Sequence, residues 1–185
     1  MKLNKLSSAG FLNVIIYAIV VFASLLDLFS GFSINLLVSL ATLAMALISY
    51  ILIVIWGSQV KRKFIQLGGM SFLVQVAIIF LIGLCLCILR PWEVLIINNV
   101  VSWIAYIFLV LDCFSRKDLK LVVLLVPCIV LPVIEYLLIE LAGISLNIVG
   151  EFFYAIIMNA DFLLLGLFLL LMKLPKEEER FSSWT

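Results

Sequence analysis

Histidine is absent from this chain of 185 residues, and charged residues make up only 12 % of it. Without histidine the chain lacks the commonest general base and metal ligand, which excludes zinc-protease His pairs and Ser–His dyads. It also lacks a glycine-rich phosphate loop and a G-x-G-D aspartyl-protease motif. Four cysteines lie in or beside apolar runs, where they serve as small apolar residues: Cys85, Cys87, Cys113 and Cys128. We therefore expect no enzyme, no metal and no cofactor.

Apolar runs recur along the whole chain. Hydrophobic residues make up 66 % of it and the mean hydropathy is +1.36, which leaves too little polar surface for a soluble domain. Segments of about 20 apolar residues cross the ~30 Å of hydrocarbon, and in lipid they must be helical. We predict an all-α integral membrane protein, a single domain over 1–185 with a short tail at 174–185. The predicted spans are 9–29, 34–56, 69–90, 94–113, 119–141 and 147–173, with four spans as the alternative.

Basic residues set the predicted orientation. In the six-span arrangement, 11 of the 12 basic residues fall on one side and only Arg90 on the other. The positive-inside rule then places both termini in the cytosol. The composition is rich in Ile, Leu, Phe and Asn, which is typical of an AT-rich bacterial gene, so the expected location is the bacterial inner membrane. Two basic loops are expected to contact anionic lipid or a soluble cytosolic partner, and not nucleic acid: Lys61, Arg62 and Lys63, and Arg116, Lys117 and Lys120.

Small and polar residues line up on one face of several predicted helices. Membrane helices pack through such residues, so these stripes predict seams that face the interior of the bundle. No GxxxG motif is present, so we expect no tight glycine crossing. The stripes are Asn13, Tyr17, Ser24 and Asp27; Asn35, Ser39, Thr42, Ala46 and Ser49; Ser71 and Gln75; Asn98, Ser102 and Tyr106, with Asn99 alongside; and Asn147, Glu151, Tyr154, Met158 and Asp161.

Two acids lie deep in the last two predicted spans. Glu135 follows Pro127 and Pro132, each of which removes a backbone donor and kinks a helix. Asp161 falls near the bilayer midplane, where an ionised acid costs at least about 2.5–3.5 kcal/mol. Asp161 can be protonated, hydrogen-bonded to Asn or Tyr neighbours, or in contact with water in a cavity. Two interpretations of this residue stay open: a functional site and a structural polar seam. The predicted intramembrane polar site comprises Asp161, Glu135, Glu151, Asn98 and Tyr154.

Arg90 is the one cation expected at the outer surface. Its long side chain can reach toward the interface and pair with an acid there. We predict an ion pair between Arg90 and Glu93 or Glu140.

Three kinds of function fit these features. One is a non-enzymatic sensor or scaffold subunit that forms a homo-oligomer and docks a soluble cytosolic partner. A second is a small transporter, or a proton or cation channel subunit, that uses Asp161 and Glu135. A third is an immunity or assembly-helper protein with neither flux nor ligand.

Two membrane families resemble the chain in general build. In length and hydropathy, with no shared motif, it resembles the membrane subunit of a Kiwa-type bacterial phage-defence system. That resemblance implies homo-oligomerisation and a soluble DNA-binding partner. Six spans and cytosolic termini also resemble the substrate-capturing subunits of energy-coupling-factor vitamin transporters. The alanines at spacing four in that family's first helix are missing, since Ala18 and Ala23 are five apart.

Overall fold

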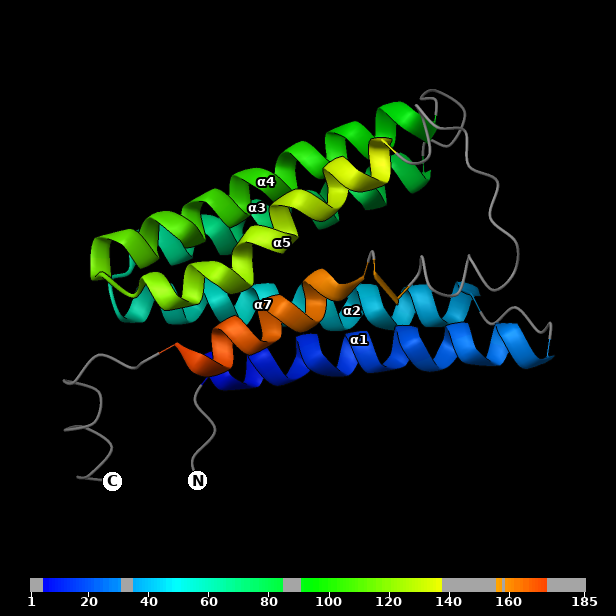
Figure 1. Cartoon of the computed structure of the whole chain (residues 1–185), viewed down its shortest axis with the longest axis horizontal. Coiled ribbons are helices and arrows are strands. Elements are labelled where there is room, and N and C mark those ends of the chain that lie inside the picture. Colours follow the sequence, from blue (N-terminus) through cyan, green and yellow to red (C-terminus); the bar gives the residue numbers. More distant parts are fainter. Residues whose placement is uncertain (1–4, 31–34, 85–90, 138–155, 158, 173–185) are drawn as a thin grey trace.

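A computed structural model of the chain describes residues 5–30, 35–84, 91–137, 156–157 and 159–172 (Figure 1). Six helices make up this part of the chain, and the predicted all-α membrane class is confirmed. The helices are α1 (Lys5–Ser30), α2 (Asn35–Gln59), α3 (Lys63–Leu84), α4 (Pro91–Arg116), α5 (Leu119–Tyr136) and α7 (Ala160–Leu171).

Four of the described helices are long and apolar enough to cross a membrane. Their spanning parts are Lys5–Leu28, Val38–Gln59, Lys63–Leu81 and Ile96–Arg116. The fifth and sixth predicted spans, 119–141 and 147–173, correspond to shorter apolar helices at Leu119–Ile134 and Ala160–Leu171. Part of both predicted spans lies outside the described residues. By length and hydropathy, the chain is a multi-pass membrane protein.

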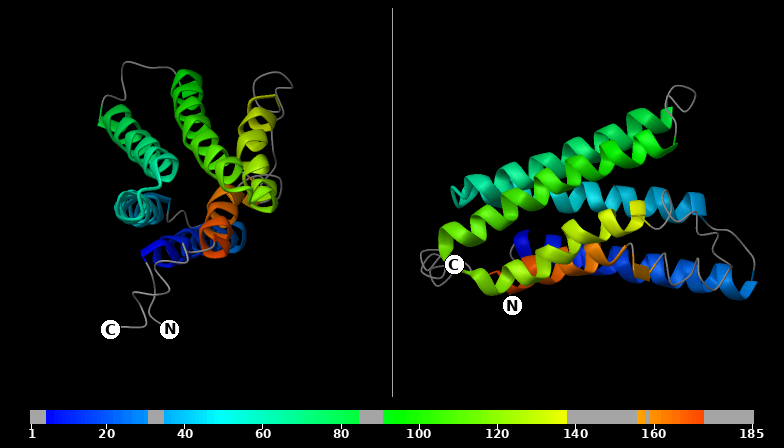
Figure 2. Two further views of the ribbon diagram at one scale, coloured as in Figure 1. Left: turned by 90° about the vertical axis from the view of Figure 1, so that its left-hand side faces the viewer. Right: turned by 45° about the horizontal axis from the view of Figure 1, so that its top comes forward.

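The described helices close into a ring. Each helix packs against the next one in the sequence, and α7 packs against both α5 and α1. Figure 2 (left) looks along this bundle, with α3 and α4 on one side and α1 on the other. The start of α1, the α2–α3 and α4–α5 turns, and the end of α7 share one end of the bundle (Figure 1). We call it the basic end, after the exposed side chains of Lys61, Lys63, Arg116, Lys117 and Lys120.

The two turns at the basic end have the same geometry. Lys61 and Lys117 have left-handed backbones, with φ of 55° and 61°. After α2, the Lys61 amide bonds to the Ser58 carbonyl at 3.2 Å and the Arg62 amide to the Gly57 carbonyl at 2.8 Å. The α4–α5 turn repeats this pattern, with the Asp118 amide 3.0 Å from the Cys113 carbonyl. Both are Schellman motifs, which satisfy the last helical carbonyls and reverse the chain within a few residues.

The bundle exposes many large apolar side chains and buries a few polar ones within its largely apolar core. Phe22, Phe80 and Val123 are 58–70 % exposed, whereas Asn13 and Ser49 are fully buried. Asn13 Nδ2 donates to Ser49 Oγ at 2.6 Å and so joins α1 to α2. Large exposed apolar surface suits a lipid environment, and buried polar pairs suit a helix seam. The predicted seams are confirmed for this pair.

A tight glycine crossing, which the lack of GxxxG led us not to expect, joins α1 to α7. A methyl group added at Gly166 would lie 2.8 Å from the Gly10 carbonyl oxygen. One added at Gly10 would lie 2.9 Å from the Gly166 carbonyl oxygen. That expectation was wrong because the two glycines come from different helices, each with a single glycine at the contact. Their lack of side chains lets the two backbones touch.

Candidate functional site

Asp161 lies in the first turn of α7 and is half-buried. Its Oδ1 accepts a hydrogen bond from the Phe162 amide at 2.9 Å. Its Oδ2 accepts one from the hydroxyl of Tyr106, on α4, at 3.3 Å. The partial positive charge of a helix N-terminus favours a carboxylate at this position. Tyr106 was predicted to lie on a bundle-facing stripe, and a hydrogen bond to an Asn or Tyr neighbour was one of the alternatives left open for Asp161; the contact fits that alternative.

A cavity of about 250 Å³ opens beside Asp161. It has room for several water molecules or for a small ligand. Polar groups come mainly from α4 and the start of α7, and apolar groups from α3, α5 and α7. The described lining residues are Gln75, Ile79, Asn98, Asn99, Ser102, Tyr106, Cys128, Leu131, Pro132, Asn159, Asp161 and Phe162.

A second cavity, of about 160 Å³, adjoins the first on the side of α2. Gln75, Ile79 and Phe162 line both cavities. Gln75 Nε2 also donates to Asn98 Oδ1 at 2.9 Å, so α3 and α4 are joined by a polar pair beside the first cavity. The remaining lining comes from α2 and α3: Ser39, Thr42, Leu43, Ala46, Tyr50 and Val76. Together the two cavities extend from α2 to α7.

An aromatic layer closes these cavities toward the basic end. Tyr50 and Phe72 stack with ring centroids 4.7 Å apart, and Phe72 meets Tyr106 edge-on at 5.2 Å. Between this layer and the basic end the interior is filled with buried side chains, among them Trp56 and Leu109. The cavities therefore occupy the half of the bundle away from the basic end.

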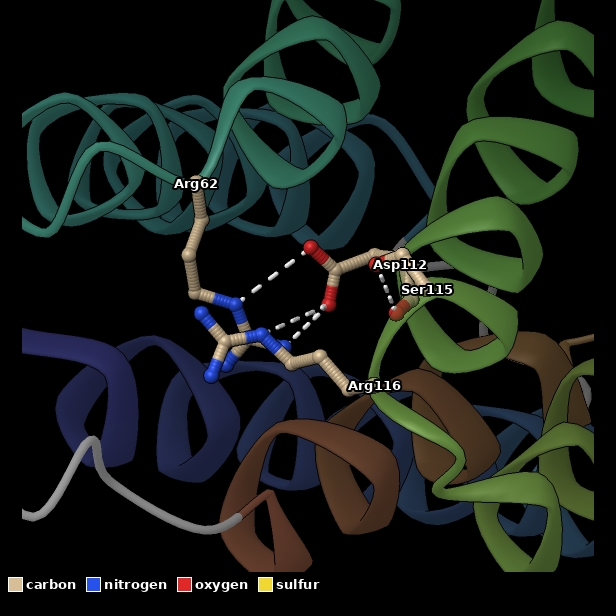
Figure 3. Close-up of polar contacts among 4 residues, drawn as sticks. All are labelled: Arg62, Asp112, Ser115 and Arg116. Carbon is tan, nitrogen blue, oxygen red and sulfur yellow. Dashed lines mark hydrogen bonds and ion pairs between the residues drawn. The ribbon is translucent and has the colours of Figure 1, made fainter.

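A buried ion pair joins the α2–α3 turn to α4 at the basic end (Figure 3). Arg62, in the α2–α3 turn, bonds to both carboxylate oxygens of Asp112 on α4, with Nε 3.3 Å from Oδ1. The two side chains are only 3 % and 4 % exposed. Arg116 Nε lies 4.0 Å from Asp112 Oδ2, and the Arg62 guanidinium carbon lies 5.3 Å from the centre of the Trp56 ring. The pair holds the α2–α3 turn against α4.

The placement of Arg62 corrects one part of the sequence interpretation. Arg62 was grouped with the exposed basic residues, but its side chain is buried and neutralised by Asp112. Lys61, Lys63 and Lys120 remain exposed, as a docking surface requires. Asp112 was missed. The one available signal was an acid at the end of an apolar run directly before the basic loop.

The structure brings together two of the predicted intramembrane residues, Asp161 and Asn98, on one cavity. The backbone of Glu135 lies in α5 and that of Glu93 in α4, but their side chains are outside the described part of the structure. Four further predicted residues lie outside the described ranges: Arg90, Glu140, Glu151 and Tyr154. The predicted Arg90 ion pair therefore stays a prediction.

Across the described residues, no group of three or more Cys, Asp or Glu side chains gathers in a metal-binding arrangement. Among the described lining residues, Asp161 is the one carboxylate, with amides and hydroxyls around it. Comparison of the chain with protein-family models, with curated proteins and with solved structures finds no match. Its function must therefore be argued from the site.

Proposed function

We propose that this multi-pass membrane protein binds a cation in the Asp161 cavity and acts as a small transport subunit. The observation that carries the proposal is a half-buried carboxylate on the wall of a roughly 250 Å³ cavity inside a membrane bundle. Acids inside membranes are rare and mark ion or substrate pathways. A cavity lined by one carboxylate, with amide and hydroxyl oxygens beside it, attracts cations and repels anions.

The closed basic end gives the proposed transport a direction. A cation reaches Asp161 from the half of the bundle that holds the cavities. To leave at the basic end it must pass the Tyr50–Phe72–Tyr106 layer and the Arg62–Asp112 pair. Transport therefore requires a second state in which both closures are open, as in alternating access.

Currents from reconstituted protein test this function. Proteoliposomes on a solid support are exposed to a cation concentration jump, and the charge displaced on binding or transport is recorded. We expect a current with wild type and with Asp27→Asn, which removes an acid of α1 that does not line the cavity. We expect none with Asp161→Asn. An unchanged current in Asp161→Asn would overturn the proposal.

A second function, a sensor or scaffold subunit with a cytosolic partner, draws support from the basic end. Five cationic side chains are exposed in and beside the two turns of this end: Lys61, Lys63, Arg116, Lys117 and Lys120. Such a surface suits an acidic protein or anionic lipid. The resemblance to a Kiwa-type defence subunit remains a prediction within this second function.

Purification in mild detergent from the native host tests the second function. We expect a soluble protein to co-purify with the wild-type chain. The double variant Lys63→Glu and Lys120→Glu is expected to lose that protein while keeping the oligomeric mass of the membrane chain. A preparation that holds this chain alone, or a partner retained by the double variant, would count against docking at the basic end.

A further inference from the structure

We propose that the Asp161 cavity selects a small organic ammonium ion, one with a single positive charge and a short apolar body. This inference rests on the proposed cation-binding function and names the class of ligand. It draws on the charge of the cavity, on its size and on the distribution of polar and apolar residues over its walls.

The charge of the cavity matches a single positive charge. Asp161 is the one acidic residue among the described residues that line it. Calcium and magnesium ions take six or more oxygen ligands, and calcium sites commonly include several carboxylates. The described lining instead offers one carboxylate with neutral amides and hydroxyls, such as those of Asn98 and Ser102. For this described lining, a monovalent cation is the better electrostatic match.

The size of the cavity is greater than a bare alkali ion needs. Selective sites for such ions replace the hydration shell with a close ring of oxygens. A volume of about 250 Å³ leaves space beyond any oxygens that contact the ion. That space suits a ligand of several non-hydrogen atoms, since small-molecule pockets are concave and largely apolar with a few convergent polar groups.

The walls of the cavity divide by chemistry. The α4 wall carries Asn98, Asn99 and Ser102, next to the carboxylate bound by Tyr106. The rest of the described lining carries apolar groups from α3, α5 and α7, Ile79, Leu131, Pro132 and Phe162, together with the polar side chains of Gln75 and Asn159. An ammonium head can bond to the carboxylate and amide oxygens while its alkyl body packs on the apolar wall. The rings of Tyr106 and Phe162 add aromatic surface that attracts a cation.

Thermal unfolding in mild detergent tests the ligand class. The midpoint is measured with methylammonium, butylammonium or choline chloride, and with NaCl or KCl at equal ionic strength. A ligand that binds only the folded state raises the midpoint as its concentration rises. We expect such a shift with at least one organic ammonium salt, none with the alkali salts, and its loss in Asp161→Asn.

A pair of variants on α5 keeps the proposal testable even if Asp161→Asn does not fold. Leu131→Phe narrows the cavity and leaves the carboxylate in place, so the preference should move toward the smaller amine. Val130→Phe adds the same bulk at a neighbouring position that is 43 % exposed, and should leave the preference unchanged.

The possible outcomes separate this inference from the proposed function. Equal shifts with alkali and ammonium salts, both lost in Asp161→Asn, would overturn the ligand class and keep cation binding. An unchanged amine preference in Leu131→Phe would place the ligand elsewhere and overturn the inference. No shift with any salt, together with no cation current, would overturn both.

Discussion

At the scale of single residues, the few charged groups that the described structure buries have partners, and so does the half-buried Asp161. Asp112 and Arg62 pair inside the basic end, and Asp161 bonds to Tyr106 inside the cavity half. Burial of a charge without a partner is costly, so each of these groups requires its partner to stay close. The two acids differ in their surroundings: Asp112 lies beside Arg62 and Arg116, whereas Asp161 lines a cavity.

Removal of Asp112 should destabilise the fold strongly. Asp112→Ala leaves Arg62 buried without its partner, and loss of one member of a buried pair costs about 3–5 kcal/mol. The double variant Arg62→Met and Asp112→Leu should recover most of that loss, because it removes both charges. Thermal unfolding in detergent measures the stability of the single and the double variant. Asp118→Ala, which removes an acid in the neighbouring turn, is the control. A stable Asp112→Ala protein would show that the pair does not hold the turn.

Lys117→Gly should stabilise the α4–α5 turn. A left-handed backbone costs a residue with a side chain about 1–2 kcal/mol, and glycine escapes most of this cost but loses more entropy on folding. The net gain should be at most about 1 kcal/mol. Lys117→Ala removes the same charge without freeing the backbone, so it should give no gain. Equal unfolding midpoints for the two variants would contradict this account.

The sequence identified Asp161 as an acid within an apolar segment but indicated little about its surroundings. The cost of a midplane acid was evident from sequence, and so was the seam that contains Tyr106. Their hydrogen bond joins two residues that are 55 positions apart in the chain, and no local sequence pattern encodes such a contact. Asp112 was hidden for a related reason, because an acid beside a basic loop looks like a solvated surface charge until the fold buries it.

At the scale of helices, hydrophobicity predicted the elements and missed their ends. The third predicted span began at residue 69, whereas α3 begins at Lys63. Hydropathy marks where lipid contact begins, and a helix continues into the polar interface beyond that point. The two prolines of α5 both lie inside the helix, as the sequence placed them. The contact between α1 and α7 could not be predicted, since one glycine on each helix leaves no periodic motif.

Gly166→Ala should weaken the packing of α7 on α1. The added methyl would meet the Gly10 carbonyl oxygen and Val14 at 2.8 Å, and overpacking of this kind costs about 1–3 kcal/mol. Gly68→Ala is the comparison variant, because its closest contacts are longer: a side-chain carbon of Leu109 at 3.1 Å and the Ala105 carbonyl oxygen at 3.2 Å. We expect a lower unfolding midpoint for Gly166→Ala than for Gly68→Ala. The reverse order would contradict the close approach of these two helices.

At the scale of the whole molecule, one half of the ring of described helices is filled with buried side chains and the other half contains the two cavities. We call them the packed half and the hollow half. The packed half contains the aromatic layer, Trp56, and the Arg62–Asp112 pair at the basic end. The hollow half contains both cavities and Asp161. Neither composition nor hydropathy reveals this asymmetry.

The positive-inside rule predicts that the basic end faces the cytosol. A cysteine placed at Lys117, in a chain whose native cysteines are replaced by serine, reports its side. An impermeant maleimide should label it in inside-out vesicles and leave it unlabelled in intact cells. Labelling in intact cells would reverse the orientation, and the cavity half would then face the cytosol.

The central claim is that a cation contacts the Asp161 carboxylate. Infrared difference spectroscopy of protein with and without butylammonium chloride tests this contact most directly, because carboxyl bands respond to protonation and to ion pairing. We predict a carboxyl difference band in wild type and in Asp27→Asn, and its absence in Asp161→Asn. The same band in all three proteins would show that the cation binds elsewhere and would contradict the account.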